Sequence, residues 1–115
     1  MIAKTGTRKS ADTNPLILKK TLEVISGKWR LNIIYQIGNE VRRYGELRRM
    51  IPQVSEKILV QELKALVNLG VVEKKMYNEV PPRVEYALTE KGRQVLPLLL
   101  KLTSVGEVFL KPEAN

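Results

Sequence analysis

The sequence predicts a mostly helical α+β fold in which a helix-turn-helix is followed by a two-stranded β hairpin. Two observations favour this fold. Apolar side chains recur with a period of 3.6 along residues 55–69, which is typical of a helix that buries one face. Two short β-like runs, 71–77 and 83–88, then flank Pro81 and Pro82, and consecutive prolines indicate a stiff connection rather than a central strand.

The composition indicates one globular domain with a basic surface. A chain of 115 residues, 43% hydrophobic and 28% charged, is ordinary for a globular protein. Twenty Lys and Arg against twelve Asp and Glu give a net charge of +8. Such a surface suits nucleic acid, although anionic membranes and acidic proteins also attract basic proteins.

The chain contains no cysteine and no histidine. Disulfides, thiol sensing and nearly all zinc sites are therefore excluded, as is the commonest general base near neutral pH. No glycine-rich phosphate loop or convergent acid pair is present, so we expect no enzyme activity, metal or cofactor. The first residues lack the apolar segment of a signal peptide, and no apolar run approaches the roughly 20 residues of a membrane span. We therefore expect a cytoplasmic protein without a membrane partner.

The chain divides into a flexible basic arm at 1–13, a folded domain at 14–110 and a tail at 111–115. Asn14 and Pro15 are typical of a helix start, and this helix should end at 26–27. Ser26 is expected to cap a second helix over 28–37. Its apolar stripe, which includes Trp29, predicts a central position in the core.

Residues 39–44 predict a minimal edge strand, and 45–50 a short helix. A turn at Pro52 and an N-cap at Ser55 complete the helix-turn-helix. A last helix is expected over 90–110, and its apolar residues surround most of its circumference.

The helix after Ser55 is the candidate for reading DNA. Lys57, Gln61 and Lys64 form a polar stripe opposite its leucines, near the end that recognition helices direct at base edges. Lysine can address guanine and glutamine can pair with adenine. A solvated helix face is the alternative interpretation, but the preceding turn and following hairpin favour a nucleic-acid contact.

Basic residues flank this helix on both sides. Candidate phosphate contacts are Arg42, Arg43, Arg48 and Arg49, with Lys28 as a weaker fifth. At the hairpin tip, Pro81, Pro82 and Arg83 are typical of a wing that carries a cation to the neighbouring minor groove. The alternatives are a solubilising surface for the arginines and a simple strand connection for the prolines.

Four segments, 24–29, 43–47, 55–59 and 79–89, resemble the HxlR family of bacterial winged helix-turn-helix transcriptional regulators. The likeness runs over about 14–110, and 79–89 is its most distinctive part. It implies a winged helix with a C-terminal dimerisation helix, a pseudo-palindromic double-stranded DNA site, and a homodimer formed by the first and last helices. The residues expected in the dimer contact are Leu18, Leu22, Leu99, Leu102 and Phe109.

Two departures from the family pattern affect this expectation. Many members carry a cysteine where this chain has Asn14, so thiol sensing is excluded here. Val60 stands where a small hydroxyl residue is common, and its side chain suits contact with a thymine methyl group. A winged-helix module that binds protein is the remaining alternative. The sequence leaves open the operator, the regulated genes, activation or repression, and any small-molecule effector.

Overall fold

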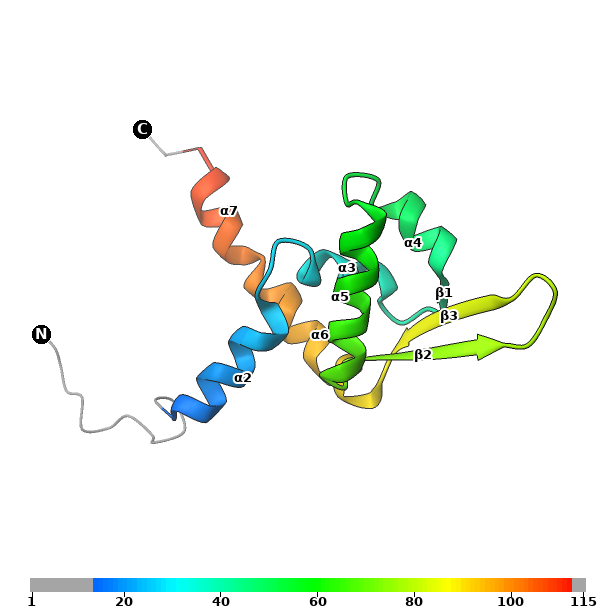
Figure 1. Cartoon of the computed structure of the whole chain (residues 1–115). Helices are drawn as coiled ribbons and strands as arrows, with labels where there is room; N and C mark the ends of the chain where they lie inside the picture. The colour runs from blue at the N-terminus through cyan, green and yellow to red at the C-terminus, as the bar shows by residue number, and fades with distance from the viewer. Residues whose placement is uncertain (1–13, 113–115) are drawn as a thin grey trace, which may run out of the picture.

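The computed structural model describes residues 14–112, which form six helices and a three-stranded sheet. The basic arm at 1–13 and the end of the tail lie outside the described residues. In chain order the elements are α2 (Pro15–Ile25), α3 (Arg30–Ile37), β1 (Arg42–Arg43), α4 (Tyr44–Met50), α5 (Glu56–Asn68), β2 (Val72–Tyr77), β3 (Arg83–Leu88), α6 (Glu90–Leu102) and α7 (Ser104–Leu110). The β2–β3 hairpin projects from one side of the helices, whereas α2 and α7 lie on the opposite side (Figure 1).

The sheet is antiparallel and its strand order is β1-β3-β2. Lys74 of β2 and Arg42 of β1 both lie opposite Tyr86 of β3. The predicted hairpin and the predicted minimal edge strand are therefore confirmed. Because side chains alternate between the two faces of a strand, Val72, Lys74 and Tyr86 share one face.

The core forms where α3 and α5 pack with α4, α6 and the sheet. Ile33, Ile34 and Ile37 of α3 are completely buried, which confirms the predicted central position of this helix. Their partners on α5 are three leucines of the predicted stripe, Leu59, Leu63 and Leu66. Trp29 is half-buried and packs against the same cluster.

Side chains that accept hydrogen bonds from backbone N–H groups mark three predicted helix starts. The side chain of Asn14 accepts from the Leu16 N–H at 2.8 Å. Ser55 Oγ accepts from the Ile58 N–H at 3.1 Å, and Thr89 Oγ1 accepts from the Gly92 N–H at 3.0 Å. Each cap satisfies an N–H group that has no partner within its helix.

The start of α3 differs from the prediction. Ser26 does not cap this helix; it is the C-cap of α2, and its N–H donates to the Leu22 carbonyl oxygen at 2.7 Å. Gly27 then takes a φ of +90°, which turns the chain before α3 begins at Arg30.

The last helix also differs, because it breaks at Thr103 into α6 and α7. The hydroxyl of Thr103 donates to the Leu100 carbonyl oxygen at 2.6 Å. The hydroxyl of Ser104 donates to the Lys101 carbonyl oxygen at 2.7 Å. Hydroxyl side chains compete with the helical hydrogen-bond ladder in this way, so two adjacent ones interrupt the predicted continuous helix.

Candidate nucleic-acid interface

The outer face of α5 carries the residues predicted to read DNA. Lys57, Gln61 and Lys64 are exposed along this face, while the leucines of the opposite face are buried. Val60 is 47% exposed and lies on the side of α5 that faces the hairpin. The Ser55 hydroxyl is already engaged as the N-cap of α5. The turn before α5 is anchored by Val54, which is buried. The helix therefore presents its predicted stripe to solvent from a fixed position.

The four clustered arginines fall into two groups. Arg42 Nε donates to the Gln36 carbonyl oxygen at 2.9 Å, and Arg48 Nη1 donates to the Val54 carbonyl oxygen at 3.2 Å. Both side chains are half-buried. Arg43 and Arg49 are exposed. Arg42 and Arg48 thus hold the backbone around the helix-turn-helix, and Arg43 and Arg49 are the pair that projects into solvent.

Lys28 lies apart from this cluster. Its Nζ is 5.1 Å from the ring centroid of Trp29, and its side chain lines a groove of about 510 Å³ between α3 and α6. Lys28 therefore does not line the groove between α5 and the hairpin.

Arg83 at the hairpin is held by its own strands. The carboxylates of Glu79 and Glu85 lie 3.2 and 3.4 Å from its guanidinium nitrogens, and its Cζ lies 3.9 Å from the ring centroid of Tyr77. The contact with Glu85 is an ion pair without hydrogen-bond geometry, since Arg83 Nε is buried without a hydrogen-bond partner. Pro81 and Pro82 remain exposed beside this cluster. The predicted wing cation is thus neutralised locally by two glutamates.

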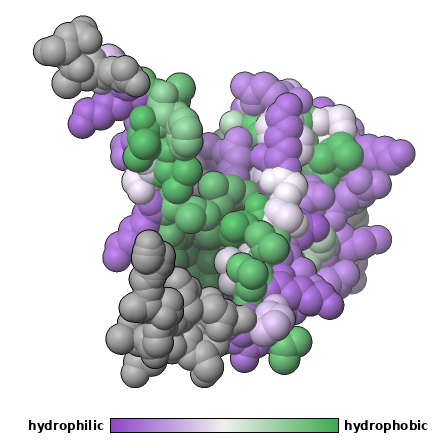
Figure 2. All heavy atoms as spheres, turned by 90° about the vertical axis from the view of Figure 1, so that its left-hand side faces the viewer, coloured by the Kyte–Doolittle hydropathy of each residue, from purple (hydrophilic) through white to green (hydrophobic). Residues whose placement is uncertain are grey.

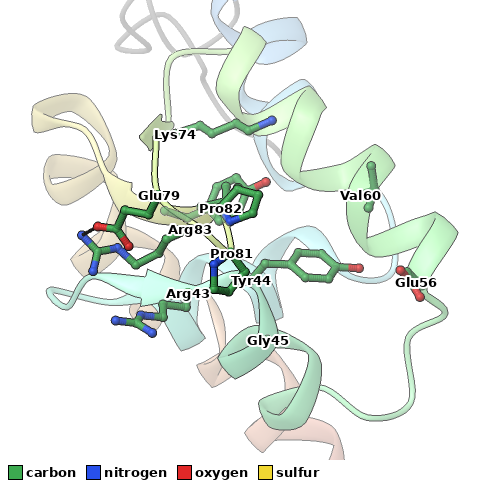
Figure 3. A pocket seen from close by; sticks show the side chains of 12 residues that line it. Arg43, Tyr44, Gly45, Glu56, Val60, Lys74, Glu79, Pro81, Pro82 and Arg83 are labelled. Atoms are coloured by element: carbon green, nitrogen blue, oxygen red, sulfur yellow. Dashed lines mark ion pairs between the residues drawn. The ribbon is translucent and has the colours of Figure 1, made fainter. Parts of the chain in front are cut away.

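A groove of about 660 Å³ separates α5 from the hairpin. Figure 3 shows Tyr44 reaching across it from α4 toward Glu56 and Val60 on α5. Lys74 enters from β2, and Arg43 lies on its other side. Sequence patterns did not single out Tyr44 or Lys74. The alternation along β2, which places Lys74 on the same face as buried Val72, was the one available signal.

The hydroxyl of Tyr44 is buried and has no hydrogen-bond partner among the described residues. Removal from water raises the pKa of this phenol, and the carboxylate of Glu56 raises it further, while Arg48 acts in the opposite direction. The group is therefore a neutral hydrogen-bond donor that is closed off from solvent.

The side of the molecule opposite the hairpin is apolar. Figure 2 shows hydrophobic residues gathered around a hollow on the side that α2 and α7 occupy. Leu18, Leu22, Leu102 and Phe109 are 58, 52, 42 and 82% exposed, so their side chains are available for the dimer contact that the resemblance implies. Leu99 is a correction, because it is only 7% exposed and belongs to the core of the protomer. It lies on the face of α6 that packs against α3.

Other kinds of site find no support within residues 14–112. This part of the chain contains no group of three His, Cys, Asp or Glu residues placed to hold a metal ion. None of its helices is long and apolar enough to cross a membrane.

An exposed reading face on the second helix of a helix-turn-helix, with a β hairpin beside it, defines a winged helix-turn-helix of the DNA-binding class. The family model described as HxlR-like helix-turn-helix matches residues 24–114. The chain therefore belongs to the HxlR-like family and is a transcriptional regulator with a helix-turn-helix DNA-binding fold.

Relatives support the same assignment. The uncharacterized HTH-type transcriptional regulator YkvN of Bacillus subtilis (strain 168) is 43% identical over 93 residues, which cover 81% of this chain and 79% of that protein. A crystal structure described as a MarR-family transcriptional regulator from Porphyromonas gingivalis W83 is 43% identical, with a TM-score of 0.73, covering 93% of this chain and 96% of that one. The redox regulator HypR in its oxidized form is 35% identical with a TM-score of 0.73, covering 84% and 98%. These relatives carry the names of regulators rather than enzymes.

Proposed function

We propose that this protein binds specific double-stranded DNA as a homodimer and regulates transcription from a pseudo-palindromic operator. One observation carries the proposal: α5 exposes Lys57, Gln61 and Lys64 beside the hairpin, with Arg43 and Arg49 exposed on the adjoining strand and helix. Base-reading side chains and phosphate-binding cations are the two components that a sequence-specific DNA contact requires.

The apolar face on the far side supports the homodimer. Large side chains of α2, α6 and α7 gather there, and a contiguous apolar surface of this kind is typical of a protein contact. Since this face lies opposite the hairpin, association through it leaves the reading helices of both protomers exposed (Figure 1). Dimers of this class bind half-sites about one helical turn of DNA, or a multiple of it, apart.

Selection of bound sequences from random duplex DNA tests the proposal. The expected result is an enriched palindrome whose half-site spacing follows the two-fold symmetry of the dimer. Failure to enrich any sequence, with binding that is equal for all duplexes, would contradict specific recognition.

The alternative is that the same face binds a protein, and salt distinguishes the two. Affinity for DNA should fall linearly in a plot of log K against log salt, because phosphate binding releases counterions. With about 6–10 phosphate contacts per dimer, the loss between 50 and 200 mM salt is about 10³–10⁵-fold. An apolar protein contact would lack this steep dependence.

A further inference from the structure

The last helical segment, α7, is held in the protomer mainly by its connection to α6. Leu96 and Leu99 are the last buried side chains of α6, and every described residue from 100 onward is exposed. No residue of α7 is buried, and the helix extends away from the rest of the protomer (Figure 1). Within one protomer, the joint at Thr103 and Ser104 therefore sets the direction of α7.

This joint is a turn of 3₁₀ character between two α-helical segments. In an α-helix each N–H donates four residues back, whereas a 3₁₀ turn uses three. Here the Thr103 N–H donates to the Leu100 carbonyl oxygen at 3.2 Å, and the Gly106 N–H donates to the Thr103 carbonyl oxygen at 3.1 Å. The ψ of Thr103, −17°, also lies nearer to 3₁₀ than to α-helical values. Short 3₁₀ stretches of this kind often mark hinges within helices.

Two hydroxyl side chains hold the turn in place. Thr103 Oγ1 donates to the Leu100 carbonyl oxygen and Ser104 Oγ donates to the Lys101 carbonyl oxygen, at 2.6 and 2.7 Å. Each bond engages a carbonyl oxygen that the α-helical ladder would otherwise use, and side chains that bond back to the preceding turn bend helices. The residue types at 103 and 104 therefore favour the joint over a continuous helix.

The joint also decides which side of α7 faces the neighbouring protein. Successive residues advance by about 120° in a 3₁₀-helix and by about 100° in an α-helix. Over a turn of three residues, this difference rotates the apolar face of α7 by about 60° relative to α6. That face includes the exposed Val105, Val108 and Phe109, which lie at i, i+3 and i+4.

We propose that Thr103 and Ser104 are positioning residues that set the spacing between the two DNA half-sites. The inference rests on the proposed function, in which a second copy of this chain covers the apolar face that α7 shares with α2 (Figure 2). The reading helix α5 is fixed to the protomer core by its buried leucines. The angle at the joint therefore relates the dimer contact to α5, and so determines the distance between the two reading helices.

The distance between the two reading helices can be measured without DNA. The chain has no cysteine, so Gln61→Cys provides one attachment point for a spin label on the exposed face of each α5. Double electron–electron resonance then gives the distance between the two labels of a dimer. Replacing both hydroxyl residues, Thr103→Ala with Ser104→Ala, favours a continuous helix and should change this distance by at least about 3 Å, the rise of one base pair.

Selection from random duplex DNA should show the same change in the preferred site. The double alanine variant should enrich the half-site of the wild type, because α5 is unaltered, but at a different spacing. On a duplex with the wild-type spacing its affinity should fall about tenfold, since the DNA must bend or twist to bring both half-sites into register.

The exchange of the two residues, Thr103→Ser with Ser104→Thr, is the matched control. It keeps a hydroxyl at both positions and should retain the label distance and the half-site spacing of the wild type. Light scattering should show a dimer for both double variants. The melting temperature of the alanine variant should not fall, because both positions are exposed.

The remaining outcomes separate this inference from the proposed function. A dimeric alanine variant with the wild-type distance and spacing would overturn the role of the joint and leave the proposed function intact. An equal loss of affinity at every spacing would do the same, since it reports general damage. A monomeric alanine variant would assign the hydroxyls to association and overturn their role in spacing. A wild type that enriches no palindrome would overturn both proposals.

Discussion

Arg30 of α3 and Glu62 of α5 form an ion pair in which Nε and Oε1 are 2.6 Å apart. Their side chains are 18 and 21% exposed. The Nη1 of Arg30 also donates to the carbonyl oxygen of Glu23 at the end of α2. One guanidinium therefore joins α2, on the apolar side of the molecule, to the helix that carries the reading face.

Glu62→Gln should lower the free energy of unfolding by about 1–3 kcal/mol, because it leaves a largely buried guanidinium without its carboxylate. Urea unfolding followed by circular dichroism measures the change. Glu90→Gln is the matched control, since Glu90 pairs with Arg93 but is 75% exposed, and it should cost less than about 1 kcal/mol. Equal losses for the two variants would show that burial of the Arg30 pair adds nothing.

Gly92→Ala should destabilise the protein through a steric clash. A Cβ at this position would lie 2.2 Å from the carbonyl oxygen of Val71, whose backbone is also bonded to the Thr89 N–H at 3.0 Å and cannot easily move. The expected loss is about 1–3 kcal/mol in urea unfolding. In Gly106→Ala the new Cβ meets nothing within 4 Å, so helix propensity should leave that variant unchanged or up to about 1 kcal/mol more stable.

Association should depend on the exposed apolar side chains of α2 and α7. Phe109→Asp and Leu22→Asp should each shift the mass measured by light scattering toward the monomer at micromolar concentration, and should weaken DNA binding in parallel. Val80→Asp is the control, because Val80 is fully exposed at the hairpin and its substitution should leave the mass unchanged. A wild type that is already monomeric at this concentration would contradict the dimer.

Leu99→Asp should behave differently from these association variants. Leu99 is 7% exposed within the protomer, so a carboxylate there would be buried without a partner. The expected outcome is loss of the cooperative unfolding transition rather than a folded monomer.

Substitutions on the reading face should separate base contacts from phosphate contacts. Gln61→Ala and Lys64→Ala should weaken binding to the selected operator by about 1–3 kcal/mol more than binding to random DNA. Arg49→Ala should weaken both alike, and Arg49 suits this test better than Arg48, whose side chain holds the turn at Val54. Fluorescence anisotropy with both duplexes measures the three variants. If all three variants lost affinity for the operator and for random DNA equally, the reading face would lie elsewhere on the protein.

The pH dependence of stability should be confined to the alkaline and acid ends. Burial raises the pKa of Tyr86 above its usual value near 10, so its contribution to stability is present below that value and is lost as pH rises through the folded-state pKa. The pKa of Glu23 is lowered, first by its hydrogen bond with Lys20, so its contribution is lost only as pH falls below about 4.5. In urea unfolding from pH 7 to 11, the stability of Tyr86→Phe should fall less steeply than that of the wild type.

DNA affinity should accordingly be nearly flat from about pH 6 to 8 at constant salt, and indifferent to diamide. The chain has no histidine and no cysteine, which sets it apart from a thiol-based redox switch. Binding curves in the presence and absence of diamide measure this. A tenfold shift would contradict the prediction, since no thiol exists to explain it.

Structural roles that depend only on residues nearby in the chain could be predicted from the sequence. Asn14 and Ser55 cap the helices that they were expected to cap, because a cap is a hydrogen bond to an N–H two or three residues away. The period of the leucines in α5 predicted its buried face, because helix geometry alone decides which residues share a face.

Contacts between segments distant in the chain were decided by the tertiary structure. The register of β2 and β3 places Tyr77 opposite Arg83, and Arg83 is consequently stacked and paired rather than extended from the tip. The packing of α6 against α3 buries Leu99, although its neighbours in the sequence are exposed. The unpartnered hydroxyl of Tyr44 exists only because α4, α5 and the hairpin meet around it, and no local pattern of residue types encodes such a meeting.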